Sequence, residues 1–317
     1  MFSVKRLSQY PQGVVVCPFQ SSWYLDIYSK HFSHTDNVLL LDVYDNEEMV
    51  AWGAFEKVND SVIFLGMKKV EENQEITDFG DITVLQPDAD YPSVWTAICE
   101  YFKMQGITKI QLDYVKEDSE TYQFFQTNPQ SVITKQEVSP FITLPASWEE
   151  YLESLERTDR KELKRKLRRI ETQPFKFIVQ NTVTEAQFGE FIRLHRLSDS
   201  AKNKFMTNKM RNFFWDLSQA PKAGEWRTTF YFLTLNDVYA AAVFTFISDS
   251  KILMYNSGFD PSMGYYSVGL ILKTMIIKRA IEDKKKIVDF LRGNERYKYD
   301  LGARNLGLFR LAIDIIL

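Results

Sequence analysis

An internal duplication is the feature of this sequence that most constrains its fold. The spacing of apolar and turn-forming residues predicts the same order of elements twice: a β-hairpin, a third strand, a loop, a helix and a last strand. The two copies occupy residues 38–55, 61–65, 92–105 and 109–114, and then residues 229–246, 251–255, 268–283 and 286–291. A helix that crosses between strands of one sheet is typical of α/β folds. We therefore expect an α/β protein with mixed sheets, built as two similar lobes in tandem.

The expected boundary between the lobes lies near residue 146. Residues 139–145 are predicted to be the closing strand of the first lobe, which Pro145 ends. Ser147 and Glu150 have the spacing of a capping box, which predicts the start of a helix. We therefore expect an N-terminal lobe of residues 1–146 and a C-terminal lobe of residues 147–317.

Composition and charge exclude several classes of protein. The chain has 317 residues, 45% of them hydrophobic and 26% charged, which is typical of a folded globular protein. Its net charge of −3 creates no overall attraction for DNA or an anionic membrane. Cys17 and Cys99 form no motif, and with three histidines they leave little for a metal site, so we expect none. The sequence shows no signal-peptide pattern and no apolar run of membrane-spanning length, which favours a cytoplasmic location.

One segment departs strongly from this average charge. Residues 157–171 contain eight Lys and Arg against three Asp and Glu. Leu163, Leu167 and Ile170 follow a helical spacing, so a narrow apolar stripe is expected to pack inward while the basic residues project from the other faces. Such a face could hold phosphates of a coenzyme, a nucleotide-linked glycan or RNA, or it could be a solvated helix surface.

Two further segments combine residues that could carry chemistry. The loop of residues 260–269 lies between a predicted strand and a predicted helix, where backbone N–H groups can hold a pyrophosphate. Its Gly264 and Gly269 would permit close approach, and Ser267 would cap the helix, although glycines there could serve turn geometry alone.

The second segment, residues 289–299, follows the last strand of the second copy. Acyl transfer needs a base, a positive group beside the oxyanion and an acid for the leaving group. Glu295 or Asp289 could be the base, Lys298 or Arg292 could stabilise the negative charge, and a tyrosine such as Tyr297 could be the acid. The alternative interpretation is a structural cluster of salt bridges.

These segments resemble the duplicated GNAT-fold acyltransferases, which are related to the FemAB-type aminoacyltransferases. The resemblance is carried by LPASWEEYLESL at residues 144–155 with the basic helix that follows, YNSGFDP at 255–261, SVG at 267–269, DFLRG at 289–293 and YK at 297–298. It covers residues 139–304 well and the N-terminal lobe in outline. Two features of those families are missing: the usual GNAT phosphate motif, and the long helical hairpin of some FemAB enzymes.

The resemblance implies two tandem GNAT-like lobes with a cleft between them and an acyl group taken from a thioester or an aminoacyl carrier. It implies donor contacts in the second lobe, and the residues expected to hold acetyl-CoA or another acyl-CoA are Gly264, Ser267, Val268, Gly269 and Arg292. Lys298 matches the family's catalytic lysine, with Glu295, Tyr297 and Asp289 as its expected catalytic partners. The expected substrate contacts are His195, Arg196, Tyr255 and Asn256. A lone histidine such as His195 could equally have a structural role.

Three functions remain open from the sequence. The first is an N- or O-acyltransferase that acts on a small cell-envelope or polysaccharide precursor. The second is a FemAB-like transferase that uses aminoacyl-tRNA, which the basic helix favours and the net charge disfavours. The third is an inactive GNAT-fold protein that binds a glycan or a partner protein. The fold alone does not decide among them, and the sequence leaves the oligomeric state open.

Overall fold

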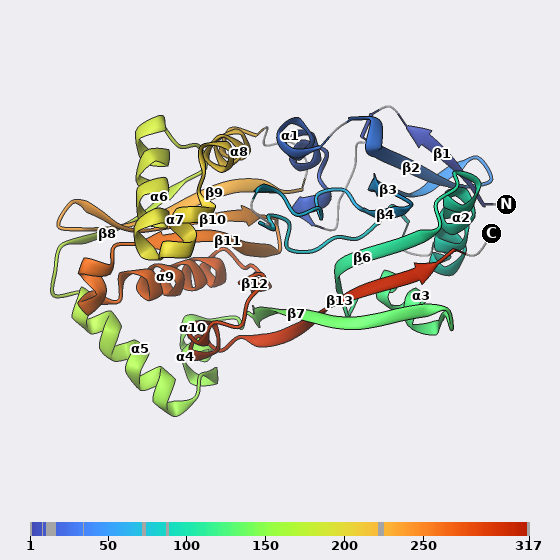
Figure 1. Ribbon diagram of the computed structural model, residues 1–317. Coiled ribbons are helices and arrows are strands. Elements are labelled where there is room, and N and C mark those ends of the chain that lie inside the picture. Colours follow the sequence, from blue (N-terminus) through green and yellow to red (C-terminus); the bar gives the residue numbers. More distant parts are fainter. Residues whose placement is uncertain are drawn as a thin grey trace. The chain divides into compact units, whose positions relative to one another are not determined.

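The computed structural model describes residues 2–7, 9–10, 17–33, 35–71, 74–86, 89–220 and 225–315 (Figure 1). Its contacts divide the chain into two compact units, each with strands and helices. Unit 1 comprises Met1–Val138 and Leu306–Leu317, and unit 2 comprises Ser139–Asn305. Unit 2 is therefore continuous in sequence, whereas unit 1 takes its last strand from the C-terminal segment of the chain.

The sheet of unit 1 has the strand order β1-β2-β3-β4-β6-β13, with β5 paired to β3. Its pairs are antiparallel except for β4 and β6, which run parallel. The strands are β1 (Phe2–Leu7), β2 (Val38–Asp45), β3 (Glu48–Val58), β4 (Ser61–Phe64), β5 (Thr83–Val84), β6 (Lys109–Lys116) and β13 (Arg304–Asp314). The helices are α1 (Ser22–Phe32), α2 (Tyr91–Met104) and α3 (Glu120–Thr127), with short 3-10 turns at Pro18–Gln20 and Thr35–Asn37.

The sheet of unit 2 has the strand order β7-β12-β11-β10-β9-β8, and only β11 and β12 run parallel. The strands are β7 (Ser131–Thr143), whose residues from Ser139 onward belong to this unit, β8 (Phe175–Gln180), β9 (Arg227–Leu235), β10 (Val238–Ile247), β11 (Lys251–Phe259) and β12 (Ile287–Asp289). The helices are α4 (Trp148–Ser154), α5 (Arg157–Ile170), α6 (Glu185–Ser198), α7 (Ser200–Phe205), α8 (Asn208–Ser218), α9 (Val268–Glu282) and α10 (Arg296–Asp300), and a 3-10 turn covers Pro261–Tyr266.

The predicted duplication is present in both units. Each unit has a hairpin, β2–β3 or β9–β10, followed by an antiparallel strand, β4 or β11, a helix, α2 or α9, and a parallel strand, β6 or β12. The helix boundaries differ from the expected ones by one residue. The prediction of an α/β protein made of two similar lobes with mixed sheets is therefore confirmed.

The strand that closes each sheet comes from an unexpected part of the chain. Residues 139–145 were expected to close the first lobe, but Phe141, Ile142 and Thr143 pair with β12 of unit 2. The strand that pairs with β6 of unit 1 is β13, near the C-terminus. The contacts therefore divide the chain at Val138 and Leu306, and not after residue 146 as expected. The alternation of apolar residues predicts a strand but does not identify its partner.

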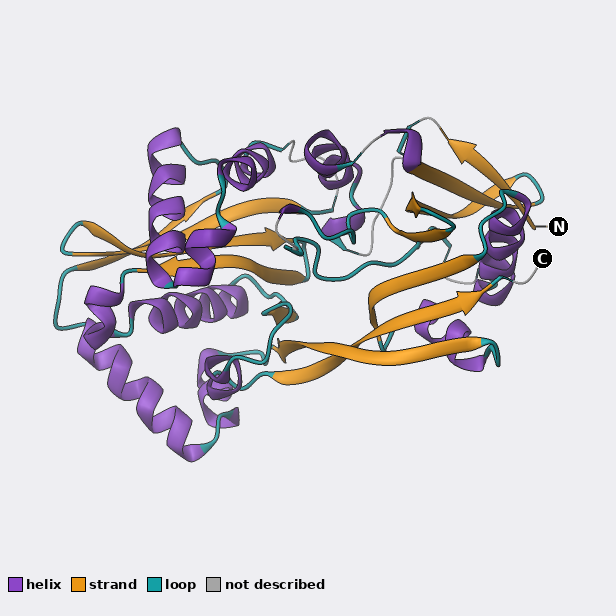
Figure 2. Ribbon diagram, viewed as in Figure 1, coloured by secondary structure: helices purple, strands orange, loops and turns teal. Residues whose placement is uncertain are grey.

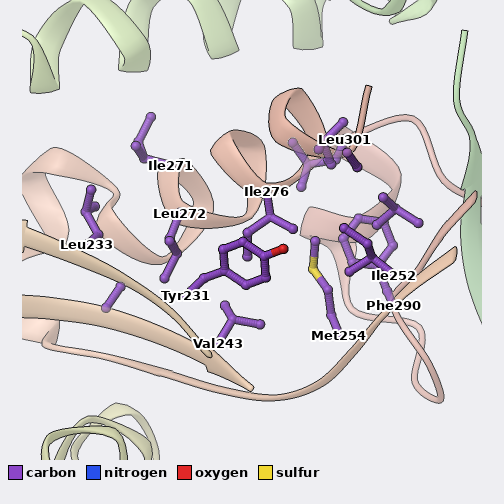
Figure 3. Packing of buried hydrophobic residues seen from close by; sticks show 14 of the residues in the cluster. Tyr231, Leu233, Val243, Ile252, Met254, Ile271, Leu272, Ile276, Phe290 and Leu301 are labelled. Carbon is purple, nitrogen blue, oxygen red and sulfur yellow. The ribbon is translucent and has the colours of Figure 1, made fainter. Parts of the chain in front are cut away.

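Helices cover both faces of the unit 2 sheet (Figures 1 and 2). On one face α9 packs Ile271, Leu272 and Ile276 against Tyr231 and Val243 of the sheet, as Figure 3 shows. On the other face Phe230 and Phe244 stack 4.4 Å apart and contact rings from α6 and α8. The two sets of sheet residues alternate along β9 and β10, as side chains of a strand that is buried on both faces must.

The strand β11 has an edge that its neighbour covers only in part. β11 has nine residues, but β12 pairs only with Lys251, Ile252 and Leu253. Within the described residues, the part of β11 from Met254 to Phe259 therefore has no strand partner on the β12 side. The chain leaves the sheet after Asp289, and the candidate site lies around the loop that follows β12.

Candidate functional site

A tight loop follows β12 and determines the shape of the site. Asp289 Oδ1 accepts hydrogen bonds from the hydroxyl of Ser139 and from the backbone N–H of Leu291, both at 2.8 Å. Leu291 and Gly293 have positive φ values of 58° and 105°. This left-handed backbone is costly for leucine, so the hydrogen bonds that Asp289 accepts offset strain in the loop. Asp289 is buried and engaged in these bonds, which makes it a positioning residue in this structure.

Lys298 holds the same loop from the other side. Its Nζ donates to the carbonyl oxygens of Leu291, Arg292 and Gly293 at 3.1, 2.8 and 2.9 Å. The ammonium also lies 2.9 Å from Glu295 Oε2. Only 1% of Lys298 is exposed. A lysine has three N–H donors, so these four acceptors use all of its hydrogen-bonding capacity.

Glu295 is the exposed member of the candidate residues in this segment, and Tyr297 is partly buried. The Glu295 side chain is 58% exposed. It packs against Gly293, where an added Cβ would lie only 2.6 Å from Glu295 Oε2. Burial raises the pKa of Glu295, but the opposing effects of Lys298 and then Lys202 are together larger. The net result is a lowered pKa, so the carboxylate is charged at neutral pH. Burial and the charge of Glu295 raise the pKa of Tyr297, so its hydroxyl keeps its proton.

A second lysine, Lys273, lies close enough to this segment to be affected by its charges. It projects from α9, is 7% exposed and places its Nζ 4.8 Å from the centre of the Tyr297 ring. Within the described residues it has no hydrogen-bond acceptor and no ion-pair partner. Burial, followed by the charge of Lys202, lowers its pKa to about 7, although Glu295 acts in the opposite direction.

Lys202 of α7 connects this cluster to the substrate residues expected on β11 and α6. Its Nζ donates to the carbonyl oxygen of Ser257 on β11 at 2.6 Å. Its charge acts on Glu295, on Lys273 and also on His195. Burial lowers the pKa of Lys202, while Glu295 and Asp199 partly offset that effect.

His195 and Asn256 form a buried pair in this region. His195 Nε2 lies 3.0 Å from Asn256 Oδ1, and because an amide oxygen only accepts, Nε2 carries the proton. Burial and then Lys202 lower the pKa of His195 to about 3, so the ring is neutral at pH 7. Its Nδ1 is buried without a hydrogen-bond partner in the described part of the chain.

Close packing of α6 on β11 places this pair. A Cβ on Gly258 would lie 2.2 Å from the backbone nitrogen of His195 and 2.3 Å from the carbonyl carbon of Leu194. No side chain fits there, so Gly258 allows the two backbones to touch. The expected motif residue Tyr255 is stacked on Phe214 of α8 at 5.5 Å. Arg196 donates to the carbonyl oxygen of Met206 at 2.6 Å through Nη2.

The turn before α9 differs in part from its expected role. Ser267 precedes the helix with φ of 53°, but its side chain makes no capping hydrogen bond. Val268 is fully buried in the core, and a Cβ on Gly269 would lie 3.1 Å from the ring of Phe259. These two residues therefore have evident packing roles. Gly264 is exposed, and a Cβ there would meet nothing within 4 Å.

Basic residues of α5 lie beside this turn. Arg169 Nη1 donates to the carbonyl oxygen of Tyr265 at 2.7 Å, and its guanidinium carbon lies 4.4 Å from the centre of that ring. Arg165 is close enough for Tyr265 to affect its pKa. The first N–H groups of a helix have no intrahelical partner and carry partial positive charge. The N-terminal end of α9 and the side chains of Arg165 and Arg169 on α5 therefore form a positive region together.

The predicted residues thus fall into three groups. The first group belongs to the loop after β12 and the short helix α10: Asp289, Arg292, Glu295, Tyr297 and Lys298. The second is the hydrogen-bonded pair of His195 and Asn256, and the charge of Lys202 acts on both Glu295 and His195. Gly264, Ser267, Val268 and Gly269 lie around the start of α9. The sequence interpretation missed Lys202 and Lys273. Lys273 does leave a signal, because it interrupts the apolar stripe formed by residues such as Ile276 and Ala280 on α9.

The arrangement is suited to charge stabilisation and proton transfer by side chains. In the described part of the chain, no group of three or more His, Cys, Asp and Glu side chains is placed to hold a metal ion. Among the described residues, no helix has both the length and the apolar character needed to cross a membrane.

Comparison with known proteins identifies the domain that carries this site. Residues 157–299 match the family model of the acetyltransferase (GNAT) domain. No curated protein matches the sequence. The matched residues lie within unit 2 and include the loop after β12, α9 and the basic helix α5. Unit 2 therefore contains the segment that is similar to a GNAT acetyltransferase domain.

Solved structures extend the likeness to the rest of the chain. FemX has a TM-score of 0.61 and 12% identity, with 95% of this chain and 91% of that chain covered. L-PGS from Bacillus licheniformis has a TM-score of 0.58 and 11% identity, with 97% and 95% covered. A tandem GNAT protein from the clavulanic acid biosynthesis pathway has a TM-score of 0.53 and 9% identity, with 100% and 99% covered. Such identities show the fold alone, and together with the matched domain they show that the chain has a GNAT fold.

Proposed function

We propose that the protein transfers an acyl group from an acyl-CoA-like donor to an amino or hydroxyl group of a small cell-envelope or polysaccharide precursor. The observation that carries this proposal is the positive region formed by the uncapped start of α9 with Arg165 and Arg169 of α5. The start of a helix beside two guanidinium groups suits the phosphates of a donor. The exposed Gly264 leaves room for a donor to approach the backbone.

The loop after β12 would supply the chemistry in this proposal. The acceptor's nitrogen or oxygen attacks the acyl carbonyl carbon, a C–N or C–O bond forms, and the C–S bond to the carrier breaks. The acceptor loses a proton and the sulfur leaving group gains one. Glu295 is the exposed carboxylate of the segment and could accept a proton, while Tyr297 retains a proton that it could donate. Asp289 and Lys298 would hold the loop in position.

A second candidate function, transfer from aminoacyl-tRNA, is favoured by one observation. α5 has a hollow of about 510 Å³ lined by Arg157, Arg160, Lys161, Lys164, Leu167 and Arg168. These cations extend along the helix beyond the turn before α9. A nucleic-acid backbone could contact the whole row, whereas a coenzyme has too few phosphates to do so.

Two substitutions separate the candidates. We expect Arg169→Ala to weaken binding of either donor by about tenfold, the equivalent of one charge-assisted hydrogen bond. We expect Lys161→Ala to leave acetyl-CoA binding unchanged but to weaken binding of charged tRNA and reduce its salt dependence. Calorimetry with acetyl-CoA, filter binding with charged tRNA and a transfer assay would measure these effects. Absence of binding and transfer with both donors would favour the inactive binding protein.

A further inference from the structure

A small polar cavity lies at the C-terminal end of α9. It has a volume of about 130 Å³ and lies between that end of the helix and the strands β8 to β11 of unit 2. The helix α9 begins at Val268, so with a rise of about 1.5 Å per residue the cavity lies roughly 20 Å from the turn proposed to hold the donor. It is therefore a separate feature of unit 2 and not a part of the proposed donor site.

The cavity has a buried floor and an accessible side. Arg227, Thr229 and Tyr231 line it and lie two positions apart on β9, so their side chains point to the same face of the sheet. Thr229 and Tyr231 are only 1% and 2% exposed. Arg279 and Asp283, which line the cavity from α9 and its C-terminal end, have side chains that are 49% and 38% exposed. A small solute can therefore enter from the α9 side.

Positive charge is in excess around this cavity. Its lining includes three cationic side chains, those of Arg227, Arg279 and Lys285. Asp283 is the one carboxylate among the described residues that line it, and Asp249, which also acts on Lys285, lies outside the lining. The C-terminal end of a helix adds a partial negative charge of about half an elementary charge, which is smaller than the excess. The cavity therefore favours an anion.

Several hydrogen-bond donors in the lining have no acceptor in the described part of the chain. The guanidinium of Arg227 has five N–H groups, but there it makes no hydrogen bond and no ion pair. The hydroxyl of Tyr231 has no described hydrogen-bond partner either. Asn181 accepts from the hydroxyl of Thr229 at 3.0 Å through Oδ1, which leaves its amide N–H groups for another acceptor. A group with several oxygen atoms would satisfy these donors together.

Asp283 provides the cavity with an acceptor. Its Oδ2 accepts from Arg279 Nε at 2.9 Å, and its Oδ1 has no partner among the described residues. An anion that carries a proton can donate it to this carboxylate, whereas an anion without one is repelled by it. Hydrogen phosphate has two negative charges and one O–H group, so it matches both the charge excess and the acceptor. Sulfate and the dianion of a phosphate monoester lack that O–H group.

We propose that this cavity binds inorganic phosphate as hydrogen phosphate, with Arg227 among its donors and Asp283 as the acceptor of its proton. The volume of about 130 Å³ exceeds the roughly 30 Å³ that one water occupies in the liquid. It is smaller than the roughly 300 Å³ at which sites for drug-sized ligands begin. It therefore suits an ion of five heavy atoms and not a nucleotide, and the proposal does not depend on acyl transfer.

Calorimetry on the intact protein tests the choice of anion. We would titrate inorganic phosphate, sulfate and glycerol phosphate at pH 8 into protein in a buffer free of all three. We expect phosphate to bind at least tenfold more tightly than the other two anions, because each of them lacks a proton for Asp283. We expect Asp283→Asn to remove this preference, because an amide can donate to an oxygen without a proton. Equal binding of the three anions by the unchanged protein, or no binding of phosphate, would overturn the proposal.

Variants locate the bound phosphate. Arg227 makes no described hydrogen bond, so we expect Arg227→Leu to leave thermal unfolding without phosphate nearly unchanged and to weaken phosphate binding at least tenfold. The matched control is Lys176→Met on β8, which removes one positive charge from a 67% exposed side chain outside the lining and should leave binding unchanged. Phosphate binding that is lost in Arg169→Ala but kept in Arg227→Leu would belong to the turn before α9 and would contradict the proposal.

Discussion

Lys298 and Lys273 are both buried, but the protein gives them opposite surroundings. Lys298 has an acceptor for every N–H group, and Lys273 has none among the described residues. A fully bonded lysine stabilises the loop that it holds, whereas a buried lysine without an acceptor is costly to keep in its charged form. The two lysines therefore contribute differently to the stability of the fold.

The effect of Lys298→Met should include a loss of stability as well as of activity. The change leaves three carbonyl oxygens of the strained loop and Glu295 without their shared donor. We expect unfolding free energy to fall by about 3 kcal/mol, measured by urea denaturation, and acyl transfer to be lost. Glu295→Gln keeps the ammonium and its carbonyl partners, so we expect a stability change below about 1 kcal/mol with a large loss of turnover. Full turnover in Glu295→Gln would exclude the carboxylate as the base.

The sequence predicted the residues of this loop but not their bonding. Asp289, Glu295, Tyr297 and Lys298 were identified from residue type and motif, and they do occupy one segment. The hydrogen bond from Leu291 to Asp289 depends on the left-handed backbone of Leu291. The hydrogen bond from Ser139 depends on the strand β7, 150 positions earlier in the sequence. Residue type alone carries neither piece of information.

At the scale of elements, the contact between α6 and β11 places His195 next to Asn256. It depends on Gly258, where the backbones of the strand and the helix touch. The sequence showed the glycine within a motif, and the backbone contact explains why a side chain is excluded there. The expected cap at Ser267 did not form, because a residue with positive φ does not direct its side chain as a normal N-cap does.

Gly258→Ala adds only one methyl group, but we expect it to disturb the His195–Asn256 pair strongly. The added Cβ would collide with backbone and not with a flexible side chain, so α6 must move. We expect a loss of about 3 kcal/mol in unfolding free energy. The matched control is Gly264→Ala, where the added Cβ meets nothing and the change should stay within about 0.5 kcal/mol. Equal stability of the two variants, measured by thermal unfolding, would contradict the close approach.

At the scale of the whole molecule, the duplication and the class of fold were predictable because they rest on repeated local patterns. The origin of the closing strands was not. Only the long-range pairing of β7 and β13 shows that β7 joins the sheet of unit 2 and that β13 joins the sheet of unit 1.

Fragments of the chain should reflect this connectivity. We expect residues 139–305 to fold alone, because all the residues that pair the strands of that unit lie within them. Residues 1–138 should not form a stable unit unless residues 306–317 are joined to them by a flexible linker, because β6 otherwise loses its partner β13. Circular dichroism and hydrogen exchange would show this. Strong protection of β6 in the isolated 1–138 fragment would contradict the expectation.

The return of β13 to unit 1 also affects the order of events during translation. A ribosome makes residues 1–138 before unit 2, but β13, the antiparallel partner of β6, emerges only after all of unit 2 has been synthesised. Unit 2, although second in sequence, can complete its sheet earlier. The unpaired edge of β6 remains open to wrong partners throughout that interval, which makes the nascent chain a natural client for chaperones that shield strand edges.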